Sequence, residues 1–259
     1  MLHGLANLMG HGFGWKRDEP DDRDHRYSPP SQVAANLPPA VDLRRYFRPV
    51  YSQFSINACT GNALAAAIEF DELKQGIKGV TRPSRMFIWY NERKMEGLQL
   101  QDTGGQIRNG IKSVAKQGVC PESSWEYRVK KYMVEPPRAC YAQARRYRAV
   151  SYERMLHNLD HLRACLASGY PFVFGFKVYE SFQGSRVRRT GIVDMPRPGE
   201  KSVGLHAVVA VGYDDARRRF LVRNSWGERW GREGYFSMPV DYLLDPQLSH
   251  DFWTIRVVR

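Results

Sequence analysis

The sequence lacks any apolar run long enough to cross a membrane. A membrane-spanning helix needs about 18 or more apolar residues in succession, and no stretch of the 259-residue chain reaches that length. The first twenty residues also lack the basic start and the long apolar centre of a secretory signal peptide. We therefore expect no membrane span, and a protein that is either cytoplasmic or exported by a route without a signal peptide.

Cysteine is also scarce, since the chain has only Cys59, Cys120, Cys140 and Cys165. So few cysteines in a chain of this length exclude a small scaffold held together by disulfides. Paired zinc-binding cysteines and a glycine-rich phosphate loop are absent as well. A histidine pair at positions 157 and 161 has the spacing of half a metal site, but an evident third ligand is missing. The sequence thus predicts no metal or other cofactor, and it leaves open whether Cys120 pairs with Cys140.

Negative charge is comparatively rare, so the formal net charge is +12. Such a surplus would suit an acidic partner, for example a nucleic acid or an acidic substrate. The basic residues are scattered, however, and their densest groups are only three or four residues long. We therefore expect most of them on solvated surface, and we expect no nucleic-acid partner.

Residues 1–40 differ in composition from the rest of the chain. They are charged and interrupted by proline, with neither helical nor strand periodicity. We expect an extended N-terminal segment over residues 1–40, followed by one domain over residues 41–259.

Within that domain, helical patterns dominate over about residues 50–145 and strand patterns over about residues 146–259. Helices are predicted in the alanine-rich run after Cys59 and within residues 83–97, 106–118 and 155–169. Strand-like runs follow at residues 171–179, 206–214, 218–226, 234–239 and 252–258. This order predicts an α+β protein with two lobes and a cleft between them.

Cys59 stands at the start of the alanine-rich helix, in the stretch SQFSINACTGNALAAAIEF. A cysteine in the first turn of a helix feels the positive end of the helix dipole, which favours the thiolate over the thiol. We expect Asn57 to cap this helix. A lone cysteine beside a buried helix is usually structural, so the case for a reactive Cys59 depends on partner residues elsewhere in the chain.

Two downstream residues are candidate partners of Cys59. His206 begins an apolar strand 147 residues after Cys59, and Asn224 follows within the stretch NSWGERWGREGY. In order and spacing these residues resemble the papain-like cysteine peptidase family, from about Leu37 to the C-terminus. The resemblance implies a helical lobe that carries Cys59 and an antiparallel, β-barrel-like lobe that carries His206 and Asn224. The active site would lie in the cleft between them.

The resemblance also implies a role for each matching residue. Cys59 would be the nucleophile, and His206 the base that becomes its imidazolium partner. Asn224 would orient the ring of His206, and Gln53 would stabilise the oxyanion together with the backbone N–H of Cys59. The implied function is a cysteine peptidase, an endopeptidase that hydrolyses a polypeptide substrate through an acyl-enzyme, and we expect a monomer.

Four further residues match substrate-binding positions of the family. Gly104 and Gly105 would pair with an extended substrate as an added strand, because no side chain obstructs the approaching peptide. Leu205 would present its carbonyl near the scissile bond. Trp226 would shield the bond between the histidine and the asparagine from water.

The chain departs from the family pattern around the nucleophile. Ile56 replaces a cysteine that many relatives bridge to the glycine region, so that disulfide cannot form; this agrees with a reducing compartment or a bacterial-type branch of the family. Asn57 and Thr60 replace the usual glycine and aromatic residue, which changes the walls near Cys59. The chain before Cys59 is longer than in a mature relative, so we expect part of residues 1–40 to lie over the cleft as an inhibitory segment.

Two other functions remain open. An acyl transferase of transglutaminase-like chemistry would use the same cysteine and histidine, although Asn224 stands where such enzymes normally have aspartate. A papain fold retained only for binding is the second, although the complete set of Gln53, Cys59, His206 and Asn224 argues against a decayed site.

Overall fold

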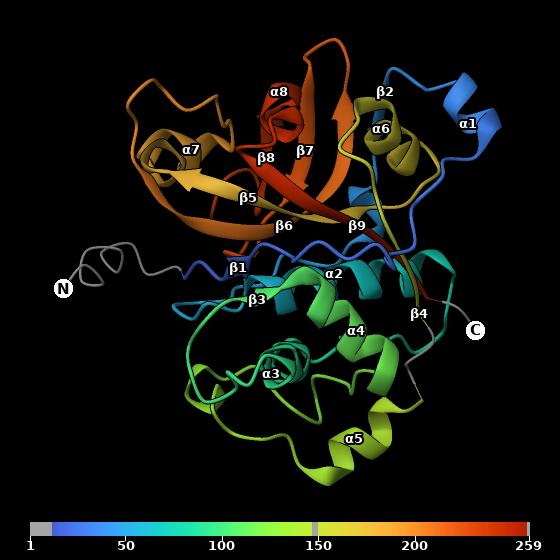
Figure 1. Ribbon diagram of the computed structural model, residues 1–259, viewed down its shortest axis with the longest axis vertical. Helices are drawn as coiled ribbons and strands as arrows, with labels where there is room; N and C mark the ends of the chain where they lie inside the picture. The colour runs from blue at the N-terminus through green and yellow to red at the C-terminus, as the bar shows by residue number, and fades with distance from the viewer. Residues whose placement is uncertain (1–11, 147–149, 258–259) are drawn as a thin grey trace.

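The computed structural model describes residues 12–146 and 150–257. These residues form two lobes (Figure 1): an antiparallel sheet with short helices against it, drawn in the upper part, and a helical group in the lower part. The lower group consists of α3 (Arg85–Met95), α4 (Ile107–Gln117) and α5 (Arg138–Ala144). The expected two-lobe α+β architecture is confirmed.

Helix α2 (Cys59–Lys74) lies between the lobes and contacts both of them. Fourteen of its sixteen residues are buried, because small alanine side chains let neighbouring elements approach from all sides. Gly61 marks the closest approach, since a Cβ atom there would lie 2.8 Å from the carbonyl oxygen of Arg85 and from Cβ of Trp89. Helix α2 is therefore a rigid base for its own first residue, Cys59.

The sheet has the strand order β4–β9–β5–β6–β7–β8, with β2 paired to β6, and every pair is antiparallel. All five strand-like runs of the sequence form strands. The strands are β2 (Ala40–Asp42), β4 (Val150–Arg154), β5 (Phe172–Tyr179), β6 (Ser202–Asp214), β7 (Arg219–Arg223), β8 (Tyr235–Pro239) and β9 (Ser249–Val257). Among these strands the sheet stays open between β4 and β8, so its barrel-like character does not extend to closure.

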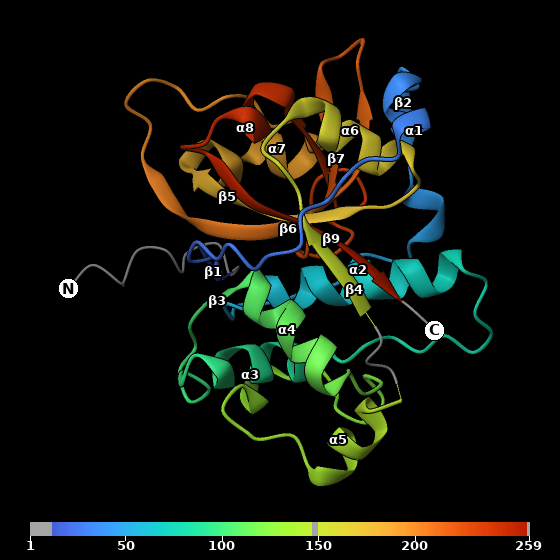
Figure 2. The same ribbon diagram turned by 45° about the vertical axis from the view of Figure 1, so that its right-hand side comes forward.

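Short helices pack on the sheet in the upper part of Figure 2. They are α1 (Ser31–Ala35), α6 (Leu159–Ala167), α7 (Ser185–Thr190) and α8 (Val240–Leu244). The chain also has 3₁₀ turns at Arg44–Tyr46, at Glu180–Gln183 and, between α4 and α5, at Val129–Lys131. Within the described ranges, no helix is both long and apolar enough to span a membrane. All four cysteines are buried and free, so Cys120 and Cys140 do not form a disulfide here.

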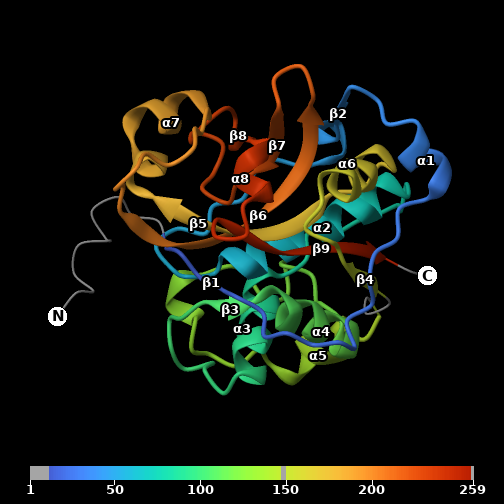
Figure 3. The ribbon, with the colours of Figure 1, turned by 45° about the horizontal axis from the view of Figure 1, so that its top comes forward.

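The described part of the N-terminal segment runs along the junction of the two lobes, as the blue trace in Figure 3 shows. Its strand β1 (Trp15–Lys16) pairs in parallel with β3 (Gly105–Gln106). The sequence pattern predicted no helix before residue 40, and this was wrong at α1, which forms a single short turn after Pro30. Residues 1–11 of the expected segment lie outside the described ranges. The segment thus forms a separate two-stranded sheet with the glycine strand β3.

Candidate active site

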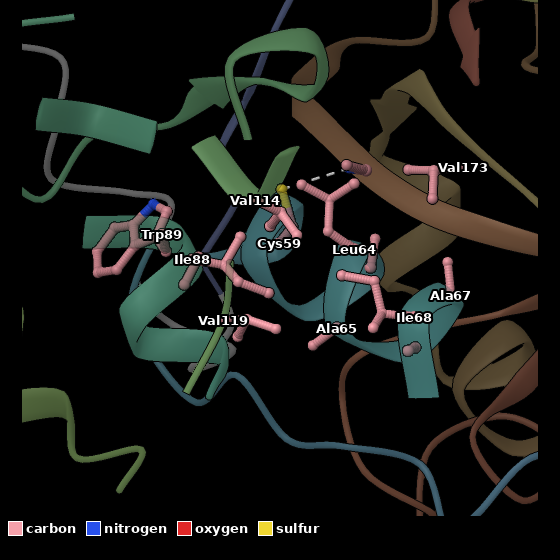
Figure 4. Packing of buried hydrophobic residues seen from close by; sticks show 14 of the residues in the cluster. Cys59, Leu64, Ala65, Ala67, Ile68, Ile88, Trp89, Val114, Val119 and Val173 are labelled. Carbon is pink, nitrogen blue, oxygen red and sulfur yellow. Dashed lines mark hydrogen bonds between the residues drawn. The ribbon is translucent and has the colours of Figure 1, made fainter. Parts of the chain in front are cut away.

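Cys59, on the helix between the lobes, contacts the strand that carries His206. Cys59 begins α2 and His206 lies in β6, and both are fully buried. The backbone N–H of Ala207, which follows the histidine, donates to Sγ of Cys59 at 3.3 Å. Figure 4 marks this bond with a dashed line and shows apolar side chains, among them Leu64 and Val114, packed around the start of the helix. The contact holds the sulfur beside the strand that carries the histidine.

Asn224 orients the imidazole ring. Nε2 of His206 lies 2.8 Å from Oδ1 of Asn224, and the backbone N–H of Ser225 donates to the same oxygen at 2.8 Å. Since two groups converge on this oxygen and an amide oxygen only accepts, Nε2 carries a hydrogen, which leaves Nδ1 as the nitrogen that can take up or release a proton. The indole of Trp226 covers this bond, with ring centroids 5.1 Å apart and an interplanar angle of 33°.

Gln53 is fixed by Ser225, a residue that the sequence patterns did not single out. Oγ of Ser225 donates to Oε1 of Gln53 at 2.6 Å, and the backbone N–H of Gln53 donates to the carbonyl of Ser225 at 2.8 Å. The amide of Gln53 therefore has only one orientation, with Nε2 as its donor side. That side points to the carbonyl oxygens of Ile56 and Gly12, each at 3.0 Å.

Asn57 connects the loop before Cys59 to Asp102, which precedes Gly104 and Gly105. Its backbone N–H donates to Oδ1 of Asp102 at 2.9 Å, and its side chain donates to the carbonyl of Asp102 at 3.0 Å. The expected capping role of Asn57 was wrong, because Ala58 occupies the cap position of α2 and no side chain caps it. These two hydrogen bonds join the loop before Cys59 to the loop before Gly104 and Gly105.

The backbone of the N-terminal segment occupies the expected substrate-binding positions. The N–H of Gly14 donates to the carbonyl of Leu205 at 3.1 Å, and the N–H of Gly105 donates to the carbonyl of Gly14 at 2.8 Å. A Cβ atom on Gly104 would lie 2.1 Å from the carbonyl oxygen of Gly14. With the contact between Gly12 and Gln53, the segment touches both walls of the cleft at once.

Two aromatic residues of the segment fill the spaces beside this backbone. Phe13 lies edge-on to His206 and Trp226, with ring centroids 6.0 and 5.9 Å away. Trp15 is 3% exposed, and its Nε1 donates to Oδ2 of Asp251 at 3.2 Å. Gly175 makes room for it, since a Cβ atom there would lie 2.0 Å from the indole ring. The alternation of glycine and aromatic residues in GHGFGW was the sequence signal for this placement of Phe13 and Trp15. The helix and strand patterns did not predict it.

Covering the cleft changes the electrostatics of Cys59. Burial raises the pKa of its thiol to about 12, with a smaller contribution from the nearby Glu92, and outweighs the lowering by the hydrogen bond from the backbone N–H of Ala207. Glu92 is itself fully buried, and burial holds its pKa well above the usual range while it accepts a hydrogen bond from Thr60 at 2.7 Å. The helix dipole was expected to favour the thiolate, but exclusion of water by the segment outweighs it. In this covered state the raised pKa favours the neutral thiol of Cys59 over the thiolate.

A buried carboxyl pair anchors the segment next to Trp15. Asp18 accepts from Nε1 of Trp253 at 2.8 Å and from the backbone N–H of Arg108 at 3.2 Å, and its own N–H donates to Asp251 at 2.8 Å. Burial, followed by the charge of Asp251, raises the pKa of Asp18 to about 7. The pair therefore tends to hold one proton near neutral pH.

The two histidines make separate contacts, since His161 lies in α6 and His157 precedes that helix. His157 contacts the carbonyl of Leu243, whereas the backbone N–H of His161 bonds to Asn158. In the parts of the chain that the structure describes, no three His, Cys, Asp or Glu side chains converge as metal ligands would.

Comparisons with known proteins agree with this geometry. A family model described as papain family cysteine protease matches residues 37–243. The crystal structure of xylellain, a cysteine protease from Xylella fastidiosa, is 44% identical and superposes with a TM-score of 0.92, covering 96% of this chain and 97% of that one. An uncharacterised peptidase C1-like protein of Acanthamoeba polyphaga mimivirus is 39% identical over 277 residues, which cover 98% of this chain and 89% of the viral protein. Procathepsin L 3 of Tenebrio molitor, at 17% identity and a TM-score of 0.73 over 97% of this chain and 77% of that one, shares the fold.

Proposed function

Because the chain belongs to the papain family of cysteine proteases, we propose that it is an endopeptidase whose cleft is closed by its own residues 12–16 until this segment is displaced. The observation that carries the proposal is the backbone pairing of Gly14 with Leu205 and Gly105 beside Cys59. We assign residues 1–40 to the inhibitory segment and residues 41–259 to the peptidase domain, with lobes over about 50–145 and 146–259.

The proposed chemistry follows from the site geometry. His206, held by Asn224 with Nδ1 unprotonated, takes the proton of Cys59 once the cleft is open to water and substrate. The thiolate attacks the peptide carbonyl, and Nε2 of Gln53 together with the N–H of Cys59 stabilises the oxyanion. His206 then protonates the leaving amine, and water attacks the resulting thioester to release the acid.

The direction of the segment supports a restraint rather than a substrate. The carbonyl of Gly12 accepts a hydrogen bond from Gln53, which is the donor proposed for the oxyanion. In a substrate, the residues before the scissile bond would pair with the glycine strand. Here Gly14, which follows Gly12, makes that pairing, and β1 runs parallel to β3. The segment therefore runs opposite to a substrate, which supports its resistance to cleavage in place.

Passage of the segment through the cleft also supports cleavage within chains. The segment continues from Gly12, through Gly14 beside Cys59, to Tyr27, whose N–H donates to the carbonyl of Arg154 at 2.9 Å. The cleft accordingly accepts a polypeptide that extends well beyond the reacting residues. We propose this for substrates as well.

The test compares the full-length chain with a chain that begins at Leu37, using an internally quenched peptide. We expect much faster hydrolysis by the shorter chain and none by its Cys59→Ala variant. A full-length Gly14→Ala variant serves as a second open form if removal of residues 1–36 impairs folding. Equal rates for closed and open forms would reject the restraint, whereas no hydrolysis by either open form would reject the peptidase assignment. Transfer of the acyl group to an added amine in preference to water would point to a transferase.

A further inference from the structure

The segment that fills the cleft continues as an acidic stretch, DEPDDRD at residues 18–24, and this stretch lies against basic residues of the peptidase domain. Arg108, on helix α4, is the centre of that contact. Its Nε donates to Oδ1 of Asp24 at 2.9 Å, a second guanidinium nitrogen bonds the other oxygen, and a third bonds the carbonyl of Glu19. The side chains of Arg108 and Asp24 are 5% and 6% exposed. This is a buried, two-pronged pairing of a guanidinium with a carboxylate.

Neighbouring cations extend this contact. Arg154 on β4 bonds Asp24 at 3.0 Å on one side and Asp251 at 2.9 Å on the other. Lys112, one turn after Arg108 on α4, lies 3.6 Å from Asp21. The three cations belong to the peptidase domain. Of the carboxylates paired with them here, Asp21 and Asp24 belong to the segment and Asp251 belongs to the domain. The surface of the domain is thus shaped and charged for an acidic stretch of chain.

Displacement of the segment would remove the hydrogen-bond partners of the Arg108 guanidinium. Among the described residues, the hydrogen-bond partners of its guanidinium, Asp24 and Glu19, both belong to the segment. The burial of Arg108 belongs to the closed state, so displacement exposes its guanidinium to water and removes its charge-assisted hydrogen bonds to Asp24. A new carboxylate in the same position would restore the pairing, whereas an amide would restore only part of it.

The path of the segment indicates which part of a substrate would reach this surface. From Gly14 the chain passes along the glycine strand β3 and reaches Asp24 ten residues later, as the blue trace beside α4 shows in Figure 2. Substrate residues before the scissile bond would lie on the same strand β3. They would continue over the same face of α4 and β4.

We propose that Arg108, with Arg154 and Lys112, binds acidic side chains of a polypeptide substrate upstream of its scissile bond, at the site that Asp24 occupies in the closed protein. The inference rests on the proposed function, because it requires that the segment leave the cleft. It assigns a substrate class to the enzyme: chains with an acidic stretch several residues before the point of cleavage.

Binding, measured without catalysis, tests this inference separately from the peptidase assignment. The protein is the full-length Cys59→Ala chain with Gly14→Ala, Trp15→Ala and Asp24→Asn, which release the segment and vacate the site. The probes are two fluorescein-labelled peptides of one sequence, extended upstream of the expected bond, with aspartates in one and asparagines in the other. Fluorescence anisotropy gives both affinities. We expect about tenfold tighter binding of the aspartate peptide, with a preference that shrinks as salt is raised.

Variants assign the preference to its residues. Adding Arg108→Gln is expected to bring the ratio of the two affinities close to one, while Arg108→Lys, which keeps the charge, retains part of it. Arg163→Gln is the matched control, because Arg163 pairs with Asp160 and Asp215 outside the segment. Melting temperatures verify that each variant is folded.

Equal affinity for the two peptides, or a preference that survives Arg108→Gln, would overturn the inference. Inorganic phosphate is added at the same total concentration of negative charge as the aspartate peptide. If phosphate displaces that peptide, the site binds simple anions, and the inference is overturned too. A failure of the corresponding Cys59 enzyme to hydrolyse peptides would instead count against the proposed function alone.

Discussion

Replacement of Gly14 by alanine is expected to open the cleft without removing any residue. A Cβ atom at this position would lie 1.8 Å from the carbonyl oxygen of Asn57 and 2.4 Å from its carbonyl carbon. Both are backbone atoms, held by the hydrogen bonds from Asn57 to Asp102, so they have little freedom to yield. Relief of the overlap requires that the segment move away from the glycine strand.

The magnitude follows from what the closed state would lose. The overlap itself costs about 1–3 kcal/mol, and the loss of the two hydrogen bonds of Gly14 to Leu205 and Gly105 costs about 1 kcal/mol each. The sum of roughly 3–5 kcal/mol, at about 1.4 kcal/mol per factor of ten, raises the open population by about two to three and a half orders of magnitude.

The assay is alkylation by iodoacetamide at about pH 5, where an ordinary thiol with a pKa near 8.5 hardly reacts, followed by peptide mapping. We expect Cys59 to be almost inert in the unaltered chain, because burial raises its pKa to about 12. In Gly14→Ala it should react at least about a hundredfold faster, through the ion pair with His206. Gln32→Ala, on the exposed side of α1, is the control and should change nothing.

The other three cysteines provide an internal reference, since all of them are buried. Selective reaction at Cys59 means an opened cleft, whereas equal labelling of all four means a loss of the fold. The reasoning is refuted if Gly14→Ala stays folded and Cys59 remains as slow as in the unaltered chain.

Three further outcomes are expected. Because the folded pKa of Asp18 is raised from 3.8 to about 7, the closed form binds a proton that the released segment loses, so closure weakens as pH rises from about 4 to about 7. The alkylation rate of Cys59 should therefore gain an extra increase over this pH range, and Asp18→Asn, which mimics the protonated group, should lack that increase. Parallel pH profiles of the two proteins would contradict this role of Asp18. Asn224→Ala should lower kcat/KM of the open enzyme by about 10–100-fold, since a hydrogen bond to the imidazolium is worth about 1.5–3 kcal/mol; unchanged kinetics would remove the orienting role. Gly175→Ala should speed alkylation of Cys59 by pushing out the indole of Trp15, and the effect should vanish in Trp15→Ala, with additive effects counting against direct contact.

The residues that we propose to react could be singled out from the sequence because each stands at a recognisable structural boundary. Cys59 begins an alanine-rich helix, and His206 lies at the edge of an apolar run. Their large separation along the chain is characteristic of a site built from two lobes. The strand-like runs were recovered for a similar reason, since buried antiparallel strands alternate with turn residues.

The closed state was not predictable in the same way. Trp15 lies in a charged stretch without periodicity, and its position depends on Gly175 and Asp251, which are remote in sequence. The neutral thiol of Cys59 likewise depends on water exclusion by another segment, which no local pattern encodes. Asn57 was misplaced because two bonds to Asp102 outcompete a capping bond.

The continuity of the segment with the peptidase domain has a consequence for how the restraint responds to concentration. Residues 28–36 connect the segment to the sheet and are mostly exposed. A tether of this kind holds its ligand at an effective concentration of about millimolar, so dilution of the protein does not open the cleft, and a substrate in solution competes at a disadvantage. One cut in the tether, far from Cys59, would turn the restraint into an ordinary dissociable ligand. The same contacts would then hold only at high protein concentration, and dilution alone would release the enzyme.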